Sequence, residues 1–420
     1  MCDQPNNKTL LVIGYVWPEP NSSAAGSHML SILRLFRDKG WRVVFSTPAQ
    51  DSPHRIALAA EQIEEQKILL NDNSFDEFVA ALNPQLVIFD RFMMEEQFAW
   101  RVEQACPQAM RILDSEDLQS LRHARQQALK VGRKMTQSDL FSDLARREIA
   151  AILRSDLTLV ISEFEMLLLQ QTFSVNSALI HHLPFMLSGT RPPGAQKSFS
   201  ERQHFVTIGN FRHAPNWDSV LFLQQIWPQI RKRLPRTELH IYGAYPPKKA
   251  TVLNNPATGF LVKGWAEDAM TVLSGARVCL SPLRFGAGIK GKFADAMLAN
   301  TPSVTTEIGA EGMCGDLAWP GIIADEPAAI VDAAVSLYTD ETLWTEKQQA
   351  IEPVLKQRFD AKRLGDELMI RVNKIQSELS QHRENNFIGS MLNYHSNKST
   401  YFMSKWIETK NRLAAIKSQQ

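Results

Sequence analysis

The sequence predicts an α/β protein of two domains, each built on a doubly wound parallel sheet. The chain has 420 residues, which is more than one hydrophobic core of ordinary size accommodates. Short apolar and β-branched runs alternate with segments of helical period in both halves. Between the halves, residues 187–203 lose this periodicity and collect Ser, Gly, Pro and Lys, which is typical of a surface connection between domains.

The first half opens with a βαβ unit. An apolar run predicts a strand over 9–16, and after a loop rich in Pro, Asn and Ser a helix is expected over 24–39, ended by Gly40. Further strands are expected at 41–47, 85–90, 110–114 and 157–162. We therefore predict a first Rossmann-like domain over residues 1–186.

The same alternation restarts after the linker. Strands are expected at 205–209, 238–242, 259–262, 277–281 and 302–305, with helices from Pro215, Glu267 and Lys290. Beyond Asp325 the strand signals end and helical segments follow. We predict a second Rossmann-like domain over 204–360 and a helical segment, 361–420, that packs back on the first domain.

The composition excludes several classes of protein. With 44% hydrophobic residues, 22% charged residues and a formal net charge of +1, the chain is neither disordered nor a dedicated nucleic-acid binder. Its four cysteines are scattered, with no pair at metal-ligand or redox spacing. The first apolar run is too short for a signal sequence or a membrane span, so we expect a cytoplasmic location.

Two basic segments leave peripheral contact with the inner membrane face open. Residues 401–416 place Met403 and Trp406 among lysines and arginines, and we favour a helix packed on the first domain over a membrane-surface helix. Residues 122–134 form a basic stripe that a lipid-linked acceptor would explain. A solvated helix face explains the stripe as well, and we favour it.

The most informative segment is 276–312, where a Gly-containing loop joins a strand to a helix. The helix is expected to begin near Ile289, with Lys290 and Lys292 in its first turn. Cations there oppose the helix dipole by about 0.3–1 kcal/mol each, which indicates an anionic ligand. Glycine amides, the helix N-terminus and Lys290 together suit a diphosphate, and we favour this over a solvated lysine pair.

The same glycines allow a competing interpretation. Gly286, Gly288 and Gly291 fit the dinucleotide-binding pattern G-x-G-x-x-G, with Glu307 about twenty residues further on, where the ribose-binding acid belongs. A lone match is weak evidence, the first glycine comes late after the strand, and Lys290 interrupts the tight turns. A nicotinamide-dependent oxidoreductase is therefore the less favoured alternative.

The segment GAGIKGKFADAMLANTPSVTTEIGAEGM, residues 286–313, resembles the donor site of retaining glycosyltransferases of the GT-B fold, namely glycosyltransferase family 4, or glycosyl transferases group 1. The resemblance extends to IGNFRHAPNWDSVLFL and HIYGAYPP in the second half. It extends more loosely to the loop around Gly26, to LDSEDLQSLR and to LVISEFE, and so covers nearly all of residues 9–375.

The resemblance implies two Rossmann-like domains that face across a cleft, with the donor held mainly by the second. It implies transfer of a sugar from a nucleotide-sugar donor to a glycan, a lipid-linked or a small-molecule acceptor, with retention of configuration. Neither a metal nor a cofactor is required, because fixed amides and a lysine stabilise the departing diphosphate. The candidate catalytic residues are Lys290 and Glu116. The candidate donor-binding residues are Gly26, Arg212, Trp265, Phe285, Gly286, Ala287, Gly288, Ile289 and Asp295.

The candidate residues have different expected roles. Gly288, Ile289 and Lys290 are expected to meet the diphosphate, Asp295 to accept hydrogen bonds from the ribose diol, and Trp265 to flank the base.

Four departures from the family pattern qualify these roles. Asp295 stands where Glu is common, and Ala287, eight positions earlier, replaces a second Glu. Arg212 is the nearest cation where many members carry Arg and Lys. Glu116, which starts a Glu-Asp pair where relatives have His-Asp, orients the acceptor, acts as a base or caps a helix. Loss of the paired Glu motivates a second alternative, a non-catalytic scaffold or partner subunit.

Overall fold

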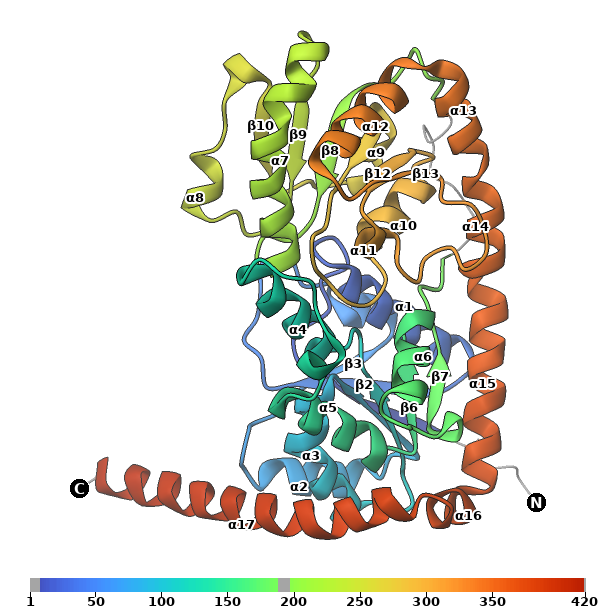
Figure 1. The fold of residues 1–420 in the computed structure, drawn as a ribbon. Coiled ribbons are helices and arrows are strands. Elements are labelled where there is room, and N and C mark those ends of the chain that lie inside the picture. The colour runs from blue at the N-terminus through green and yellow to red at the C-terminus, as the bar shows by residue number, and fades with distance from the viewer. Residues whose placement is uncertain (1–7, 188–196, 419–420) are drawn as a thin grey trace.

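A computed structural model describes residues 8–187 and 197–418 of the chain. Most of the predicted linker, residues 188–196, lies outside this description. The chain forms two α/β units stacked one above the other, with helices at its C-terminal end (Figure 1). This is the fold class that the sequence predicts.

The first sheet has seven parallel strands in the order β3-β2-β1-β4-β5-β6-β7. Its strands are β1 (Thr9–Ile13), β2 (Arg42–Thr47), β3 (Glu64–Lys67), β4 (Leu86–Asp90), β5 (Met110–Asp114), β6 (Leu157–Val160) and β7 (Ile180–His182). The chain order reverses at β1, which pairs with both β2 and β4. In open α/β sheets ligands bind outside the carboxyl ends of the strands at such a point.

Helices on both faces bury this sheet. They are α1 (Ala24–Asp38), α2 (Ser74–Leu82), α3 (Phe92–Ala105), α4 (Gln119–Lys130), α5 (Asp143–Arg154) and α6 (Glu163–Gln171). Alternate residues of the strands enter two hydrophobic cores, because successive side chains of a strand point to opposite faces. Val87 and Phe89 join one core, whereas Leu86 and Ile88 join the other.

The second sheet has six parallel strands in the order β10-β9-β8-β11-β12-β13. They are β8 (Gln203–Ile208), β9 (Leu239–Tyr242), β10 (Phe260–Gly264), β11 (Ala276–Leu280), β12 (Ser303–Thr305) and β13 (Gly321–Ile323). The accompanying helices are α7 (Ala214–Arg233), α8 (Lys248–Thr251), α9 (Ala269–Gly275), α10 (Gly291–Leu298), α11 (Glu307–Ala310), α12 (Pro327–Thr339), α13 (Glu341–Gln349) and α14 (Ile351–Arg358). The order reverses at β8, between β9 and β11.

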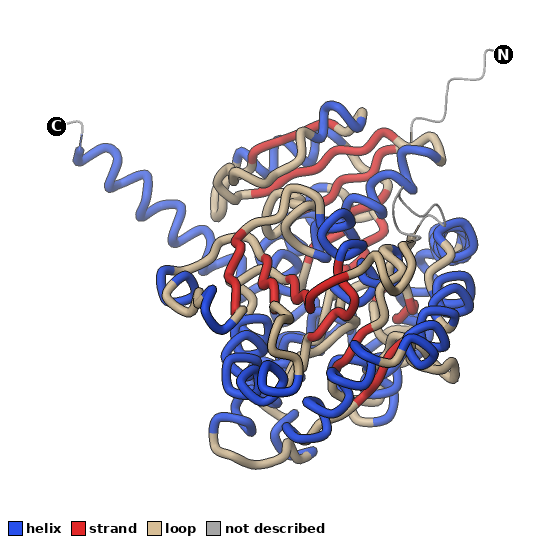
Figure 2. Tube along the Cα trace, turned by 90° about the horizontal axis from the view of Figure 1, so that it is seen from above, coloured by secondary structure: helices blue, strands red, loops and turns tan. Residues whose placement is uncertain are grey.

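The C-terminal helices return to the first sheet. These are α15 (Ala361–Ser377), α16 (Leu379–Glu384) and α17 (Phe387–Ser418). Leu364, Leu368 and Val372 of α15 belong to the core that α1 also covers. Helix α17 packs on α3 and α5 and then runs past the body of the molecule (Figures 1 and 2).

The chain crosses between the two units twice at nearly the same place. Leu187 donates its backbone N–H to the carbonyl of Phe359 at 2.8 Å, and its own carbonyl accepts from the Ala361 N–H at 3.3 Å. The two crossings are therefore hydrogen-bonded to each other as a short parallel bridge.

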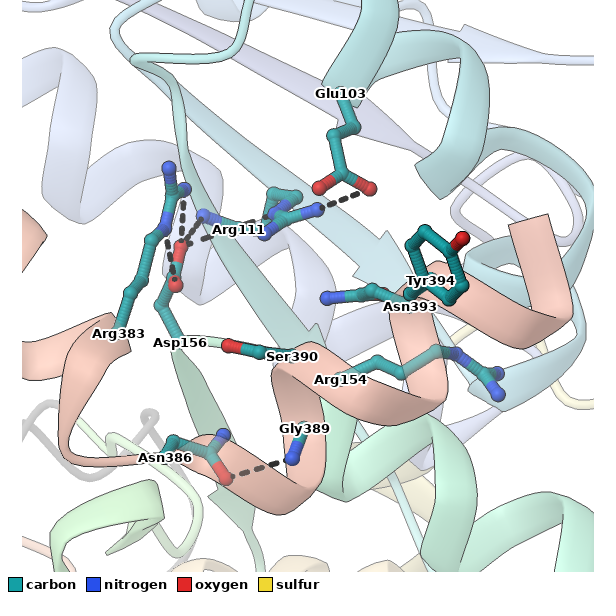
Figure 3. A pocket seen from close by; sticks show the side chains of 10 residues that line it. All are labelled: Glu103, Arg111, Arg154, Asp156, Arg383, Asn386, Gly389, Ser390, Asn393 and Tyr394. Atoms are coloured by element: carbon teal, nitrogen blue, oxygen red, sulfur yellow. Dashed lines mark hydrogen bonds and ion pairs between the residues drawn. The ribbon is translucent and has the colours of Figure 1, made fainter. Parts of the chain in front are cut away.

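A polar pocket of about 440 Å³ lies at the amino ends of β5 and β6, beneath α16 and α17 (Figure 3). Asp156 accepts from the Arg111 N–H at 2.7 Å and from two nitrogens of Arg383, each at 2.8 Å. Arg383 also donates to two carbonyls of the first unit, those of Pro107 and Ala109. These bonds fasten the C-terminal helices at the end of the sheet remote from the carboxyl edges. In the described parts of the chain, no helix is long and apolar enough to cross a membrane.

Candidate active site

The predicted diphosphate loop, residues 285–290, follows β11 and lies against the first unit. All six residues are buried. Ala287 belongs to the same buried cluster as Leu118 and Leu121 of the first unit. Ile289 packs with Ile161, which follows β6, and with Phe185. The loop therefore forms part of the contact between the two units.

Polar contacts reinforce this closure. The Gly288 N–H donates to Oε1 of Glu165, on α6, at 2.7 Å, and the same oxygen accepts from the Leu118 N–H at 3.0 Å. Arg125 of α4 donates to the Gly286 carbonyl at 2.8 Å and to both carboxylate oxygens of Glu311 at 2.8 and 2.7 Å. A side chain from the first unit thus occupies the Gly288 amide that was expected to meet phosphate.

Two glycines allow the first unit to come this close. A Cβ atom at Gly288, whose φ is 62°, would lie 2.9 Å from the Cβ of Asp117. A Cβ atom at Gly291 would lie only 2.2 Å from that of Ala24, the first residue of α1. Larger residues at either position would push the two units apart.

Lys290 is the N-cap residue of α10 and is buried at the contact. Its Nζ donates to the Gly288 carbonyl at 2.7 Å. Burial lowers the pKa of Lys290 to about 8, although Glu311 and Glu165 act in the opposite direction. Lys292, in the first turn of α10, points elsewhere and donates to Oδ1 of Asn216 at 2.8 Å. The two lysines expected at this helix start therefore have different surroundings.

Asp295 lies one turn into α10 and is half-buried. Its carboxylate receives no hydrogen bond from any residue that the structure describes. Burial raises the pKa of Asp295 to about 7. The carboxylate is therefore available to a ligand, and hydrogen bonds from a diol would stabilise its ionised form.

Trp265 and Arg212 belong to a second contact between the units. The Trp265 ring is 41% exposed, and its Nε1 donates to the Asn21 carbonyl at 3.1 Å. Its ring centre lies 4.8 Å from that of His54, which in turn meets Tyr245 at 5.0 Å. Arg212 lies over Tyr245, 3.6 Å from the ring centre.

Gly26 lies in the first turn of α1, and Ser23, the N-cap residue of this helix, accepts its N–H at 3.1 Å. A Cβ atom at Gly26 would lie 2.5 Å from the backbone carbon of Glu19. Glycine is therefore required by the fold of its own loop. That loop also contacts the second unit, since Asn210 donates to Oγ of Ser22 at 3.1 Å.

Glu116 follows β5 and stands among other acids. It is buried, and its φ of 59° is unusual for a residue other than glycine. Asp90 and Asp114 end β4 and β5 as partners in register, and Arg91 stands beside them. Burial, helped by Asp114, raises the pKa of Glu116 well above its usual value. Burial and Asp90 raise the pKa of Asp114 to about 7. These carboxyl groups can therefore hold protons near neutral pH.

Two further buried residues, His28 and Glu165, have no role predicted from the sequence. His28 is 2% exposed, its Nε2 lies 4.0 Å from Oδ1 of Asp114, and neither ring nitrogen has a hydrogen-bond partner among the described residues. Burial lowers the pKa of His28 to about 4. Glu165 belongs to the quoted segment LVISEFE, yet only its place opposite Gly288 reveals its contact with the loop.

The interpretation of the basic stripe as a solvated helix face is wrong for two of its members. Arg125 is bound to Glu311 as described, and its side chain is 9% exposed. Arg122 pairs with Asp117, beside Gly288. Both arginines face the second unit, whereas His123, Lys130, Arg133 and Lys134 are exposed.

The arrangement defines a class of protein: two facing doubly wound domains with a polar site at their carboxyl edges have the GT-B fold. Residues 202–340 match the model of the family glycosyl transferases group 1. The chain is therefore a glycosyltransferase of the GT-B fold, and its second domain is similar to that family. A search of curated proteins found no match.

Several solved structures are similar to this chain. Sucrose-phosphate synthase from Thermosynechococcus elongatus has 13% identity and a TM-score of 0.66, over 89% of this chain and 100% of that chain. HepE from Anabaena, solved with UDP and glucose, has 12% identity and a TM-score of 0.67, over 88% of this chain and 100% of that chain. WaaG, a glycosyltransferase involved in lipopolysaccharide biosynthesis, has 12% identity and a TM-score of 0.61, over 86% of this chain and 98% of that chain.

These findings confirm the predicted fold and enzyme class. The strand order counts against the nicotinamide interpretation, because the glycine motif follows β11. A dinucleotide fingerprint belongs after the first strand of its domain, which here is β8. In the described residues, no group of three or more His, Cys, Asp or Glu is placed to hold a metal ion.

Proposed function

We propose that this glycosyltransferase binds a nucleotide-sugar donor on its second domain and transfers the sugar, with retention of configuration, to an acceptor on its first domain. The observation that carries the proposal is the loop 285–290, which leads into the N-terminus of α10 and lies against Asp117, the residue after Glu116, and Glu165 on the other domain. HepE was solved with UDP and glucose, so uridine nucleotides are the first donors to test.

The donor would lie along the carboxyl edge of the second sheet. Trp265 would flank the base, with Arg212 nearby, and the half-buried Asp295 would accept the two ribose hydroxyls. The amides of residues 285–289 and Lys290 would surround the diphosphate at the start of α10. To do so they must exchange their present bonds, since Gly288 N–H is held by Glu165 and Lys290 by the Gly288 carbonyl.

Departure of the diphosphate places negative charge at this helix start. The helix dipole, fixed amides and the Lys290 ammonium stabilise such charge without a metal ion or a cofactor. Although burial lowers the pKa of Lys290 to about 8, its ammonium group stays largely charged at neutral pH. Lys290 is therefore our candidate for leaving-group stabilisation.

The acceptor would bind on the first domain, beside Glu116. Buried polar atoms there have no hydrogen-bond partner in the described structure: both ring nitrogens of His28, Oδ1 of Asp90 and Oδ2 of Asp114. Such atoms are costly to leave unpaired, and hydroxyl groups of a carbohydrate would satisfy them. Glu116, whose pKa is raised, would orient or deprotonate the attacking hydroxyl.

Nucleotide binding provides the first test. We would titrate the protein with UDP, GDP, ADP, CDP and NADH and follow thermal unfolding, expecting one nucleoside diphosphate to stabilise it by about 2.7 kcal/mol at a hundred times its Kd. Lys290→Ala should remove most of this effect, whereas Lys263→Ala, an exposed lysine of the same domain, should not. Stabilisation by NADH alone, or equal responses of both variants, would contradict the proposal.

We also propose a cytoplasmic enzyme that contacts the inner membrane face through α17, which suits a lipid-linked acceptor. On α17, Phe402, Met403, Trp406 and Leu413 are more than half exposed, although Ser404 and Glu408 between them are buried. Lysines and arginines follow among them at Lys405, Lys410, Arg412 and Lys417. Aromatic side chains next to cations favour an anionic lipid surface.

Vesicle sedimentation tests the membrane contact. We expect the protein to bind vesicles that contain phosphatidylglycerol and to bind neutral vesicles less, with binding reduced in Phe402→Ser/Trp406→Ser. Val252→Ser is the matched control, because Val252 is 80% exposed on the second domain. Equal binding by all three proteins would rule out α17 as the contact.

A further inference from the structure

Glu165 stands out among the buried acids because only one of its two carboxylate oxygens has hydrogen-bond partners among the described residues. It lies in the first turn of α6 and is 0% exposed. Its Oε1 accepts two backbone N–H groups, from Leu118 of its own domain and from Gly288 of the other. Its Oε2 is buried and has no hydrogen-bond partner in the described parts of the chain. An unpaired buried carboxylate oxygen is unfavourable unless a ligand completes it.

The surroundings of Glu165 belong to both domains. Ser162, at the N-cap of α6, also has a buried hydroxyl without a partner in the described structure. A Cβ atom at Gly312 would lie 2.3 Å from this hydroxyl, so Ser162 adjoins the segment after α11. Burial raises the pKa of Glu165 to about 8, and the Lys290 charge acts against this rise. Two polar atoms of the first domain without hydrogen-bond partners in the described structure thus lie beside the diphosphate loop, residues 285–290.

The diphosphate loop itself has few polar groups that could bind a sugar. Residues 285–288 are Phe, Gly, Ala and Gly, so no side chain there carries a polar atom. The Gly286 carbonyl is taken by Arg125. The carboxylate bonded directly to this loop, that of Glu165, comes from the other domain. A sugar held beside the loop would therefore meet the first domain's acid rather than one of the loop's own.

We propose that Glu165 determines donor specificity: its Oε2 forms a hydrogen bond with a hydroxyl group of the donor's sugar. The inference rests on the proposed function and adds which residue selects the sugar. The second domain then binds the nucleotide, and the first domain tests the sugar attached to it. Because Oε1 of the same carboxylate holds Gly288, recognition of the sugar is coupled to contact between the domains.

The test compares binding of a nucleoside diphosphate with binding of the corresponding nucleotide sugar, both by calorimetry, starting with UDP and UDP-glucose. In Glu165→Gln and Glu165→Ala, we expect affinity for the nucleotide sugar to fall tenfold to a hundredfold, roughly the effect of leaving one buried hydrogen-bonding group without its partner. Affinity for the nucleoside diphosphate should not fall, because the diphosphate alone lacks the group that Glu165 contacts. In Glu165→Ala it should rise, because the Gly288 amide is released.

Glu163→Gln is the matched control, since Glu163 lies in the same turn of α6 and also bonds the second domain, through Arg358 of α14, but is 42% exposed. Glu165→Gln keeps a carbonyl oxygen for the Leu118 and Gly288 amides, so an unchanged thermal midpoint will show that the fold is intact. A second readout is selectivity: the variant should lose the preference of the wild type between nucleotide sugars that differ at a single hydroxyl.

The possible results separate this inference from the function beneath it. Equal changes for diphosphate and nucleotide sugar, in either direction, would mean that Glu165 only joins the domains, and would overturn the inference alone. Wild-type protein that binds neither ligand, over the whole nucleotide panel, would overturn the proposed function and the inference with it. A loss restricted to the nucleotide sugar supports both.

Discussion

Replacing Arg125 with Met should weaken the contact between the domains by about 3 kcal/mol. The guanidinium donates to both oxygens of Glu311 and to the Gly286 carbonyl, at 2.7–2.8 Å, and the two side chains are only 9% and 15% exposed. Removing one partner of a buried ion pair costs about 3–5 kcal/mol, because the other charge stays buried without a partner. Some water reaches both groups, so we expect the lower value, roughly a hundredfold in the equilibrium.

A double-mutant cycle measures the coupling between Arg125 and Glu311 that this reasoning requires. Urea unfolding of wild type, Arg125→Met, Glu311→Gln and the double variant gives the coupling free energy of the pair. Arg133 and Asp139 form the matched control: both bonds are 2.6 Å long, but the pair lies at the surface within the first domain, with Arg133 46% exposed. Exposed pairs contribute about 0.2–1 kcal/mol. A coupling for Arg125 and Glu311 no larger than that of the control pair would refute the reasoning.

Two further predictions concern domain contact and pH. In Gly291→Ala the new Cβ would lie 2.2 Å from that of Ala24, so we expect a larger radius of gyration by small-angle X-ray scattering. Gly275→Ala, where no atom lies within 4 Å, should leave it unchanged. Donor affinity by calorimetry should be greatest between pH 7 and 8, the pKa values of Asp295 and Lys290. It falls below about 7 as Asp295 takes up a proton and above about 8 as Lys290 loses one, and Asp295→Asn should abolish the loss on the acid side.

Elements with a strong local signal were predictable from sequence. The buried run 110–114 was predicted as a strand and is β5, with all five residues buried. Strand β3 was missed because its sequence, Glu-Glu-Gln-Lys, is exposed at the edge of the sheet and has no apolar residue. The three-residue strands β7 and β13 were also missed, whereas β12, which is equally short, was predicted over 302–305.

The candidate site was predictable only within each domain. The loop 285–290 and the start of α10 were found because glycines, a lysine and a helix start are adjacent in sequence. Glu165 lies 123 residues from the Gly288 amide that it accepts, and nothing local marks that pairing. For the same reason Arg125 was expected to be solvated, since its partner Glu311 is 186 residues away. Contacts across domains depend on how two separately folded surfaces meet.

Under the proposed function, donor binding and domain contact compete for the same groups. The Gly288 N–H that suits a phosphate already donates to Glu165, and Lys290 is buried beneath the first domain. A backbone N–H makes one strong hydrogen bond at a time. The diphosphate can therefore accept the Gly288 N–H only if Glu165 moves or gives up its bond to it. If the donor binds as proposed, the first domain has to separate from the loop for the donor to enter, and close again to bring Glu116 towards the sugar. We expect the double crossing at Leu187 and Asp360, where the chain segments are hydrogen-bonded to each other, to be the pivot of that movement.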